Sequence, residues 1–281
     1  MFKKNIGSHL SIDETSISNG ELYTIVTNKA AKGGQGSLVA MIEGTKTSDI
    51  SAILSKIPLN KRKQVKEMTL DFSNSMETAS RLSFCNAKIV NDRFHVQKLI
   101  SEAVQEMRIT QRWKAIKEEN KQVKICREQN KSYRPKTYQN GDTKKQLLAR
   151  SRYLLFKPKN KWKTNQLKRS IILFKEFPEL ETAYHLSMMF RAFYECSKTK
   201  EQAKLMLERW YKKVEEKEFD SFVTTMEYLK NHEDTILNYF TNRSTNASAE
   251  SFNSKLKGFR ALVRGVRDKS FFLFRVSKIY G

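Results

Sequence analysis

Residues 10–28, LSIDETSISNGELYTIVTN, contain two β-prone runs joined by Asn19-Gly20. An Asn-Gly pair between such runs is the strongest short-range signal for a β-hairpin, because both turn residues must tolerate positive φ. The sequence therefore predicts two antiparallel strands, Leu10–Ser18 and Glu21–Asn28. A Gly-rich turn then leads into a third β-prone run, Leu38–Ile42, and the three runs together predict a meander.

Helical and strand patterns alternate after the meander. A helix is predicted by apolar residues at helical spacing, with Ser48 or Asp49 as its N-cap; these apolar residues are Ile50, Ile53, Leu54 and Ile57. The pattern continues as a strand, a helix and a strand, at Val65–Leu70, Met76–Phe84 and Ala87–Val90. Strand, helix, strand implies parallel pairing through a right-handed crossover. The predicted fold is therefore α/β, with a mixed sheet of three antiparallel strands followed by parallel strands.

From about residue 100 to 240 the apolar spacing becomes helical. Two stripes of large apolar side chains at this spacing are expected to form core rather than a cofactor site; they are Leu186, Met189, Phe190 and Phe193, and Leu207, Trp210, Tyr211 and Val214. The three cysteines have no CxxC spacing, so the sequence indicates neither a disulfide framework nor a cysteine-rich zinc site.

Positive charge dominates the composition. The chain has 53 Lys and Arg against 30 Asp and Glu, a formal net charge of +23. Such a charge favours a polyanionic partner, and nucleic acid is a stronger candidate than an anionic membrane. No apolar stretch approaches the ~20 residues of a membrane span, and the N-terminus has no apolar export segment. We therefore expect a cytoplasmic protein that associates with the nucleoid when it is bound to DNA.

The charge is concentrated in residues 121–175, here called the basic segment. It has 17 Lys and Arg against Glu128 and Asp142, a net charge of +15. It also contains aromatic residues that lie between the cations, among them Tyr133, Tyr138, Tyr153, Phe156 and Trp162. Interleaved basic and aromatic residues suit a surface that follows a nucleic-acid backbone and stacks on bases. A solvated flexible loop is the alternative for residues 131–145.

Three carboxylates stand where they could converge on metal ions. Asp13 and Asp71 lie in or after predicted strands, and Glu250 lies on a predicted helix, Ala247–Phe259. Asn253 and Lys257 share a face of that helix with Glu250. Two Mg²⁺ ions about 4 Å apart would stabilise the attacking and leaving oxygens of a displacement at phosphorus. Taken singly, each residue has a structural alternative: a surface aspartate, a helix cap and a solvated glutamate.

The order and spacing of four motifs resemble the ISL-three-type insertion-sequence DDE transposases. These motifs are Ser11–Glu14, Met68–Asp71, Asn86–His95, and Ala249–Lys255 followed by Arg264-Gly265. The resemblance implies a ribonuclease-H-like fold with a large all-helical insertion before the last catalytic helix. It divides the chain into a first part of the core (1–99), the insertion (100–240) and a C-terminal catalytic region (241–281).

By the same resemblance, Asp13, Asp71 and Glu250 form a catalytic triad that binds Mg²⁺ or Mn²⁺, with two ions expected. Asp92 and His95 match a D-x-x-H element, in which the histidine contacts DNA or Asp92 simply caps a helix. Asn253 would orient the glutamate, and Lys257 and Arg264 are further candidates for contacts to DNA.

Full-length relatives carry zinc-binding and helix-turn-helix segments before the core, whereas Asp13 lies 12 residues from Met1. We therefore expect either that a separately encoded protein recognises the element ends or that the chain is a truncated remnant. The expected function is metal-dependent cleavage of the ends and strand transfer into double-stranded DNA, with a homo-oligomer as a further possibility. The alternatives are a nuclease without strand transfer and an inactive DNA-binding remnant.

Overall fold

A computed structural model of the chain describes residues 1–17, 20–263 and 268–281. These residues divide into two units, which are described separately. The first unit consists of Met1–Val96 and His232–Gly281, and the second of Gln97–Asn231.

The first unit is built on a five-stranded sheet. Its elements up to residue 96 are η1 (Lys3–Asn5), β1 (His9–Ser16), β2 (Leu22–Asn28), η2 (Lys29–Ala31), β3 (Leu38–Glu43), α1 (Thr47–Leu54), α2 (Leu59–Lys63), β4 (Glu67–Leu70), α3 (Asn74–Ser83), β5 (Lys88–Asn91) and the first turn of α4 (Arg93–Glu128). The chain returns to this unit with α11 (Glu233–Leu237), α12 (Tyr239–Asn242), α13 (Ala247–Leu262) and α14 (Lys269–Tyr280).

The strands lie in the order β3-β2-β1-β4-β5. β1 pairs antiparallel with β2, and β2 with β3, whereas β4 pairs parallel with both β1 and β5. The prediction of a mixed sheet, with three antiparallel strands and then parallel ones, is confirmed. Gly20 has a φ of 82°, as the predicted turn requires, whereas Asn19 lies outside the described residues.

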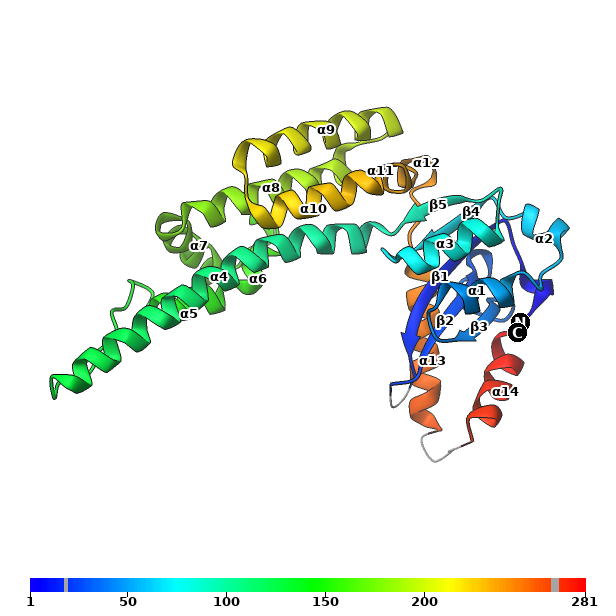
Figure 1. Cartoon of the computed structure of the whole chain (residues 1–281), viewed down its shortest axis with the longest axis horizontal. Helices are drawn as coiled ribbons and strands as arrows, with labels where there is room; N and C mark the ends of the chain where they lie inside the picture. Colours follow the sequence, from blue (N-terminus) through cyan, green and yellow to red (C-terminus); the bar gives the residue numbers. More distant parts are fainter. Residues whose placement is uncertain (18–19, 264–267) are drawn as a thin grey trace. The chain divides into compact units, whose positions relative to one another are not determined.

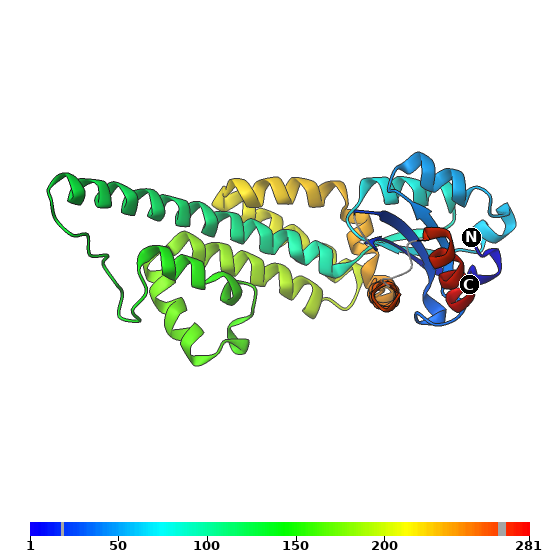
Figure 2. The same ribbon diagram turned by 90° about the horizontal axis from the view of Figure 1, so that it is seen from below.

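The two faces of the sheet are covered by helices from different parts of the sequence (Figures 1 and 2). One face packs against α1 and α3 through a core that includes Ile12, Leu70, Ile50 and Ala79. On the opposite face, α13 and α14 cover β2 and β3 through a second core; it contains Tyr23, Ile25, Leu38, Phe252, Leu256, Phe272 and Val276. Side chains alternate along a strand, and Ile12 points toward α1 and α3. Its neighbours in β1, Ser11 and Asp13, therefore point toward the α13 side.

The predicted start of the first helix is wrong. α1 begins at Thr47 after Lys46, and no side chain caps it. Ser48 and Asp49 lie inside its first turn, where the Ser48 hydroxyl donates to the Asp49 carboxylate instead of to a helix N–H. Ile57 lies beyond the end of α1 but is still buried in the core of that face.

The second unit is entirely helical apart from an isolated bridge between Thr137 and Thr143. It contains the rest of α4, then α5 (Lys144–Arg150), α6 (Arg152–Leu155), η3 (Lys159–Lys161), α7 (Thr164–Glu176), α8 (Pro178–Cys196), α9 (Lys200–Lys217) and α10 (Asp220–Asn231). The two predicted apolar stripes lie on α8 and α9, and all their members are buried except Met189, which is half-buried. The expectation that they form core is confirmed. No helix among the described residues is long and apolar enough to cross a membrane.

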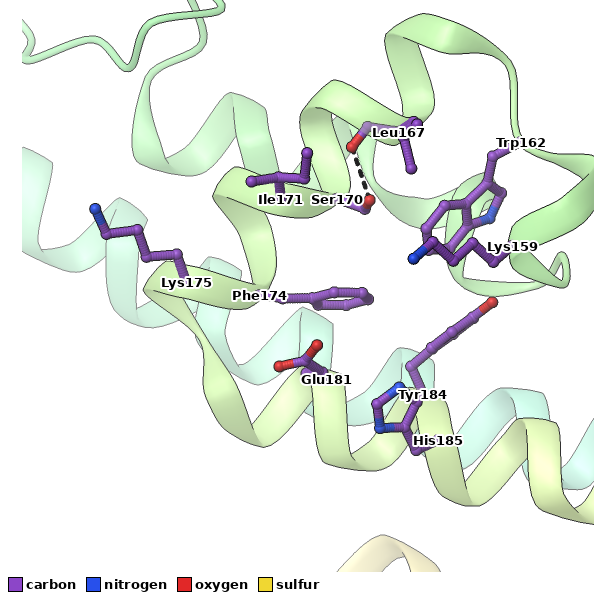
Figure 3. Close-up of a pocket in the computed structure, with 10 residues that line it drawn as sticks. All are labelled: Lys159, Trp162, Leu167, Ser170, Ile171, Phe174, Lys175, Glu181, Tyr184 and His185. Atoms are coloured by element: carbon purple, nitrogen blue, oxygen red, sulfur yellow. Dashed lines mark hydrogen bonds between the residues drawn. The ribbon is translucent and has the colours of Figure 1, made fainter.

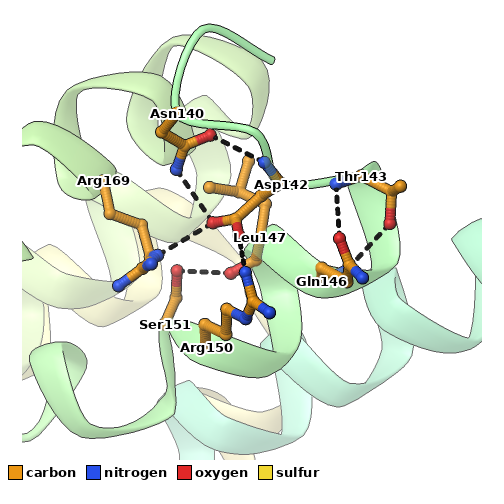
Figure 4. Close-up of polar contacts among 8 residues, drawn as sticks. All are labelled: Asn140, Asp142, Thr143, Gln146, Leu147, Arg150, Ser151 and Arg169. Atoms are coloured by element: carbon orange, nitrogen blue, oxygen red, sulfur yellow. Dashed lines mark hydrogen bonds and ion pairs between the residues drawn. The ribbon is translucent and has the colours of Figure 1, made fainter. Parts of the chain in front are cut away.

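Asp142 fixes the position where the basic segment enters α5 (Figure 4). Its carboxylate is fully buried and pairs with Arg150 and with Arg169, whose Nε lies 2.9 Å away. Asn140 donates a further hydrogen bond of 2.8 Å. Burial raises the pKa of Asp142, but the hydrogen bonds from Arg169 and Arg150 outweigh burial, and the pKa lies below its ordinary value. The segment 131–145 is therefore anchored at Asp142, whereas residues 131–141 lie outside any helix and are mostly exposed, as the loop alternative predicts.

Candidate functional site

Three aspartates form a row across three neighbouring strands, Asp13 inside β1, and Asp71 and Asp92 directly after β4 and β5. Ile12, Leu70 and Asn91 are in register across β1, β4 and β5. The residues that directly follow them are Asp13, Asp71 and Asp92, respectively. Parallel strands bring their carboxyl ends to the same edge of a sheet, so the three side chains meet there. Asp13 and Asp92 are buried, and Asp71 is partly exposed.

Helix α13 contacts this row from the other side through two asparagines. The Asn246 side chain donates to Asp71 Oδ1 at 2.9 Å, and its backbone N–H donates to Asp92 Oδ2 at 3.3 Å. About two helical turns further on, Asn253 Nδ2 donates to Asp13 Oδ2 at 2.7 Å. Asn246 immediately precedes α13 but does not cap it with its side chain. Its amide is used on Asp71 instead, so the start of the helix is tied to the sheet.

Glu250 lies on the first turn of α13, between the two asparagines. Its side chain is exposed, and the field of its carboxylate contributes to raising the pKa of Asp71. Glu250 is therefore within electrostatic reach of the aspartate row. Among the described residues its carboxylate has no hydrogen bond or ion pair, so it is free to bind a ligand.

Asp71, Asp92 and His95 are grouped closely enough to hold a metal ion, with one potential ligand atom from each within 4.8 Å of the others. His95 Nε2 lies 3.1 Å from Asp71 Oδ2. Asp92 also accepts a hydrogen bond from the Phe94 N–H in the first turn of α4. The capping alternative for Asp92 is therefore observed, and the same carboxylate still reaches Asn246.

The carboxylates of the row lie close together, and the pKa values of Asp13 and Asp71 are raised. Burial, together with the neighbouring Asp71, raises the pKa of Asp13 to about 7, and the Glu14 N–H and His95 only partly offset this. Burial also raises the pKa of Asp71, partly offset by the hydrogen bond from Asn246. A raised carboxyl pKa means that the neighbouring side chains do not neutralise the charge. A divalent cation would neutralise it, so the donor set fits a metal that prefers oxygen ligands.

The structure brings together Asp13, Asp71, Asp92, His95 and Asn253, with Glu250 nearby. Lys257 is exposed and has no hydrogen bond or ion pair with another described residue. The lysine of α13 that is held in place is Lys255, whose Nζ donates to the Gly33 carbonyl at 2.9 Å. Arg264 lies outside the described residues. The sequence analysis missed Asn246; an asparagine directly before a predicted helix was the available signal.

Comparison with known families decides to which group the chain belongs. A family model described as "Transposase", that of the ISL-three type, matches residues 10–276. The chain belongs to the ISL-three-type transposase family. The resemblance seen in the motifs is thus confirmed, and membership of this family makes DNA the substrate of the transposase and implies use of a divalent metal. No curated protein and no solved structure gives a significant match.

The pKa of Asp13 predicts how pH affects the metal-free transposase. Because the folded pKa, about 7, is above the ordinary 3.8, the folded state binds this proton more tightly than the unfolded state. Stability from this group is therefore present at about pH 4 and is lost as the pH rises through 7. We expect Asp13→Asn to raise the free energy of unfolding in EDTA by ~2 kcal/mol at pH 8, and by less as the pH falls toward 4.

Urea unfolding of both proteins between pH 5 and pH 8 measures this difference. Glu14→Gln is the matched control, because Glu14 is the exposed neighbour on the other face of β1. An equal gain in Glu14→Gln, or a gain in Asp13→Asn that does not depend on pH, would contradict the assignment of the effect to the buried carboxyl.

Proposed function

We propose that this transposase is of the DDE type: a metal-dependent enzyme that cleaves the ends of an insertion element and transfers the strand to target DNA. Asp13, Asp71 and Glu250 are the proposed catalytic and metal-binding residues. The observation that carries the proposal is the row of aspartates at the edge of the sheet, facing a helix that presents a glutamate without a partner.

The proposed metal ligands are the carboxylates of Asp13, Asp71 and Glu250, with Asp92 beside them. When bound, two Mg²⁺ or Mn²⁺ ions would supply charge stabilisation to the attacking and leaving oxygens at the scissile phosphate. Imidazole is not a ligand that Mg²⁺ favours. We therefore assign His95 to orienting Asp71, since its Nε2 lies 3.1 Å from the carboxylate.

Asn246 and Asn253 are proposed as positioning residues. Each donates a hydrogen bond to an aspartate of the row. The bond fixes the position of that aspartate relative to Glu250 of α13. Carboxylate ligands that are themselves hydrogen-bonded keep a fixed orientation, and metal affinity depends on that orientation. Lys257 and Arg264, further along the chain, are proposed contacts for DNA phosphates.

The proposed fold is ribonuclease-H-like. Its support is the strand order β3-β2-β1-β4-β5, with β1 to β3 antiparallel and β4 and β5 parallel to β1. On this proposal, segments 1–99 and 241–281 make the nuclease core, and 100–240 is an insertion placed before the helix that carries Glu250.

The test is an assay of nicking and strand transfer on labelled element-end DNA with Mg²⁺ or Mn²⁺, with and without the product of any adjacent reading frame. We expect metal-dependent nicking followed by joining of the 3′-hydroxyl end to target DNA. Glu250→Gln should lower both steps by at least about a thousandfold, roughly 4 kcal/mol of transition-state stabilisation. Glu14→Gln, an exposed carboxylate on β1, is the control and should retain activity.

The same assay separates the two alternatives. Nicking without any joining would assign the chain to nucleases that only hydrolyse DNA. DNA binding without cleavage under every condition would leave a DNA-binding remnant and reject the catalytic proposal. Charge alone supports DNA binding in either case, because phosphate neutralisation needs no active site.

A further inference from the structure

An aromatic pocket lies within the helical unit, between η3, α7 and α8 (Figure 3). Its volume is about 370 Å³, within the usual range for small-ligand sites. Three rings line it together, those of Trp162, Phe174 and Tyr184, and their centroids are 5.3 to 6.3 Å apart. Leu167 and Ile171 extend the apolar lining at the surface, where they are 39% and 64% exposed.

The polar atoms of these rings are already used inside the protein. Trp162 Nε1 donates to the Leu154 carbonyl at 2.8 Å and to the Lys157 carbonyl at 3.1 Å. The Tyr184 hydroxyl donates to the same Lys157 carbonyl at 3.0 Å. These bonds fix the two rings, so the pocket offers an occupant their π faces and edges rather than hydrogen-bonding groups.

The charged side chains that line the pocket are two lysines, Lys159 and Lys175, and one carboxylate, Glu181. Lys159 points into the same space as Trp162, Phe174 and Tyr184, whereas Lys175 points away from it (Figure 3). Most of the lining lies in the basic segment, residues 121–175, which carries 17 cationic and two anionic side chains. An occupant with a flat apolar ring and an attached anionic group would match both features.

We propose that this pocket binds one unpaired nucleobase of the DNA on which the transposase acts, with Lys159 contacting the adjacent phosphate. The inference rests on the proposed function, because that function supplies DNA ends and junctions with unpaired nucleotides. Stacking on aromatic side chains tolerates any base, so the site selects an unpaired base rather than a sequence. A paired base is held in the duplex and its faces are not available, which makes the site a sensor of local unpairing.

The test compares two DNA duplexes that differ at one position, where one has an unpaired base and the other an abasic unit. Dissociation constants are measured by fluorescence anisotropy on the full chain in EDTA. We expect about tenfold tighter binding of the duplex with the unpaired base, the effect of one stacked base. Phe174→Ala and Ile171→Glu should each abolish this preference. Ile171→Glu changes an exposed residue and therefore tests the pocket without altering the core.

Leu205 provides matched controls, because it lies on α9 of the same helical unit but outside the basic segment, does not line the pocket, and is 56% exposed. Leu205→Ala and Leu205→Glu should keep the tenfold preference, even where the added charge weakens both complexes equally. Equal affinity of the wild-type chain for the two duplexes would overturn the proposal. Survival of the preference in Ile171→Glu would overturn it as well.

The result is independent of the proposed chemistry. Binding in EDTA requires no metal, so Glu250→Gln should show the same preference as the wild type. A preserved preference in a chain that never cleaves DNA would reject the catalytic proposal and leave the pocket assignment standing. If the wild-type chain cleaves DNA but shows no preference for the unpaired base, the catalytic proposal stands and the pocket assignment is rejected.

Discussion

Asp71→Asn is expected to lower DNA nicking and strand transfer by at least about a thousandfold while DNA binding stays within about twofold of the wild type. Asparagine keeps the shape of the side chain, and its Oδ1 can still accept the 2.9 Å hydrogen bond from Asn246. The substitution removes the charge at the centre of the row, between Asp13 and Asp92, where a divalent ion would bind. Parallel assays of binding, nicking and joining on one DNA substrate measure the effect.

Asp49→Asn is the control for this substitution, because Asp49 is an exposed aspartate on α1, outside the row. It should leave all three measurements unchanged. Cleavage by Asp71→Asn at the wild-type rate would remove Asp71 from the site. Loss of DNA binding in Asp71→Asn would instead indicate a structural role for the carboxylate.

The second large effect is expected in the helical unit, where Asp142→Asn should cost about 3 to 5 kcal/mol of stability. Asp142 is fully buried and pairs with Arg150 and Arg169, and Arg169 is itself largely buried. Removing one partner of a buried ion pair leaves the remaining charge without compensation. Because the folded pKa of Asp142 is lowered, its contribution is present at neutral pH and is lost as the pH falls through that value.

Thermal and urea unfolding followed by circular dichroism would measure this loss. Glu128→Gln is the matched control, since Glu128 is the other acidic residue of the basic segment and is 62% exposed in its contact with Lys124. It should cost less than about 1 kcal/mol. Equal losses in the two variants would show that net charge, rather than the buried pair, governs stability.

Local patterns were sufficient to predict the sheet. The Asn19-Gly20 pair and the flanking β-prone runs predict the first hairpin, and the strand-helix-strand pattern predicts the parallel pairing of β4 with β5. The start of α1 was predicted wrongly at Ser48 or Asp49. Either residue is a suitable N-cap by composition, but tertiary packing begins the helix at Thr47 without a capping side chain.

The site was only partly predictable, because its contacts join distant positions. The sequence could single out Asp13 and Asp71 as residues in or after strands, and Asp92 through its motif, but the strand register is what brings the three into one row. Asn246 carries the cap signal of a helix start, yet its side chain bonds to Asp71, 175 residues away. Spacing along the sequence cannot distinguish a capping asparagine from one that reaches the sheet.

The two hydrogen bonds from α13 have a consequence for synthesis of the chain. Asn253 and Asp13 are 240 residues apart, and the whole helical unit is made between the aspartates and the helix that contacts them. At roughly 5 to 20 residues per second, Asp92 is translated about 8 to 30 s before Asn246. A growing chain therefore has all three aspartates long before it has the helix that holds them. Any copy of the gene interrupted between the codons for Asp92 and Asn246 encodes the aspartate row without Asn246, Glu250 or Asn253.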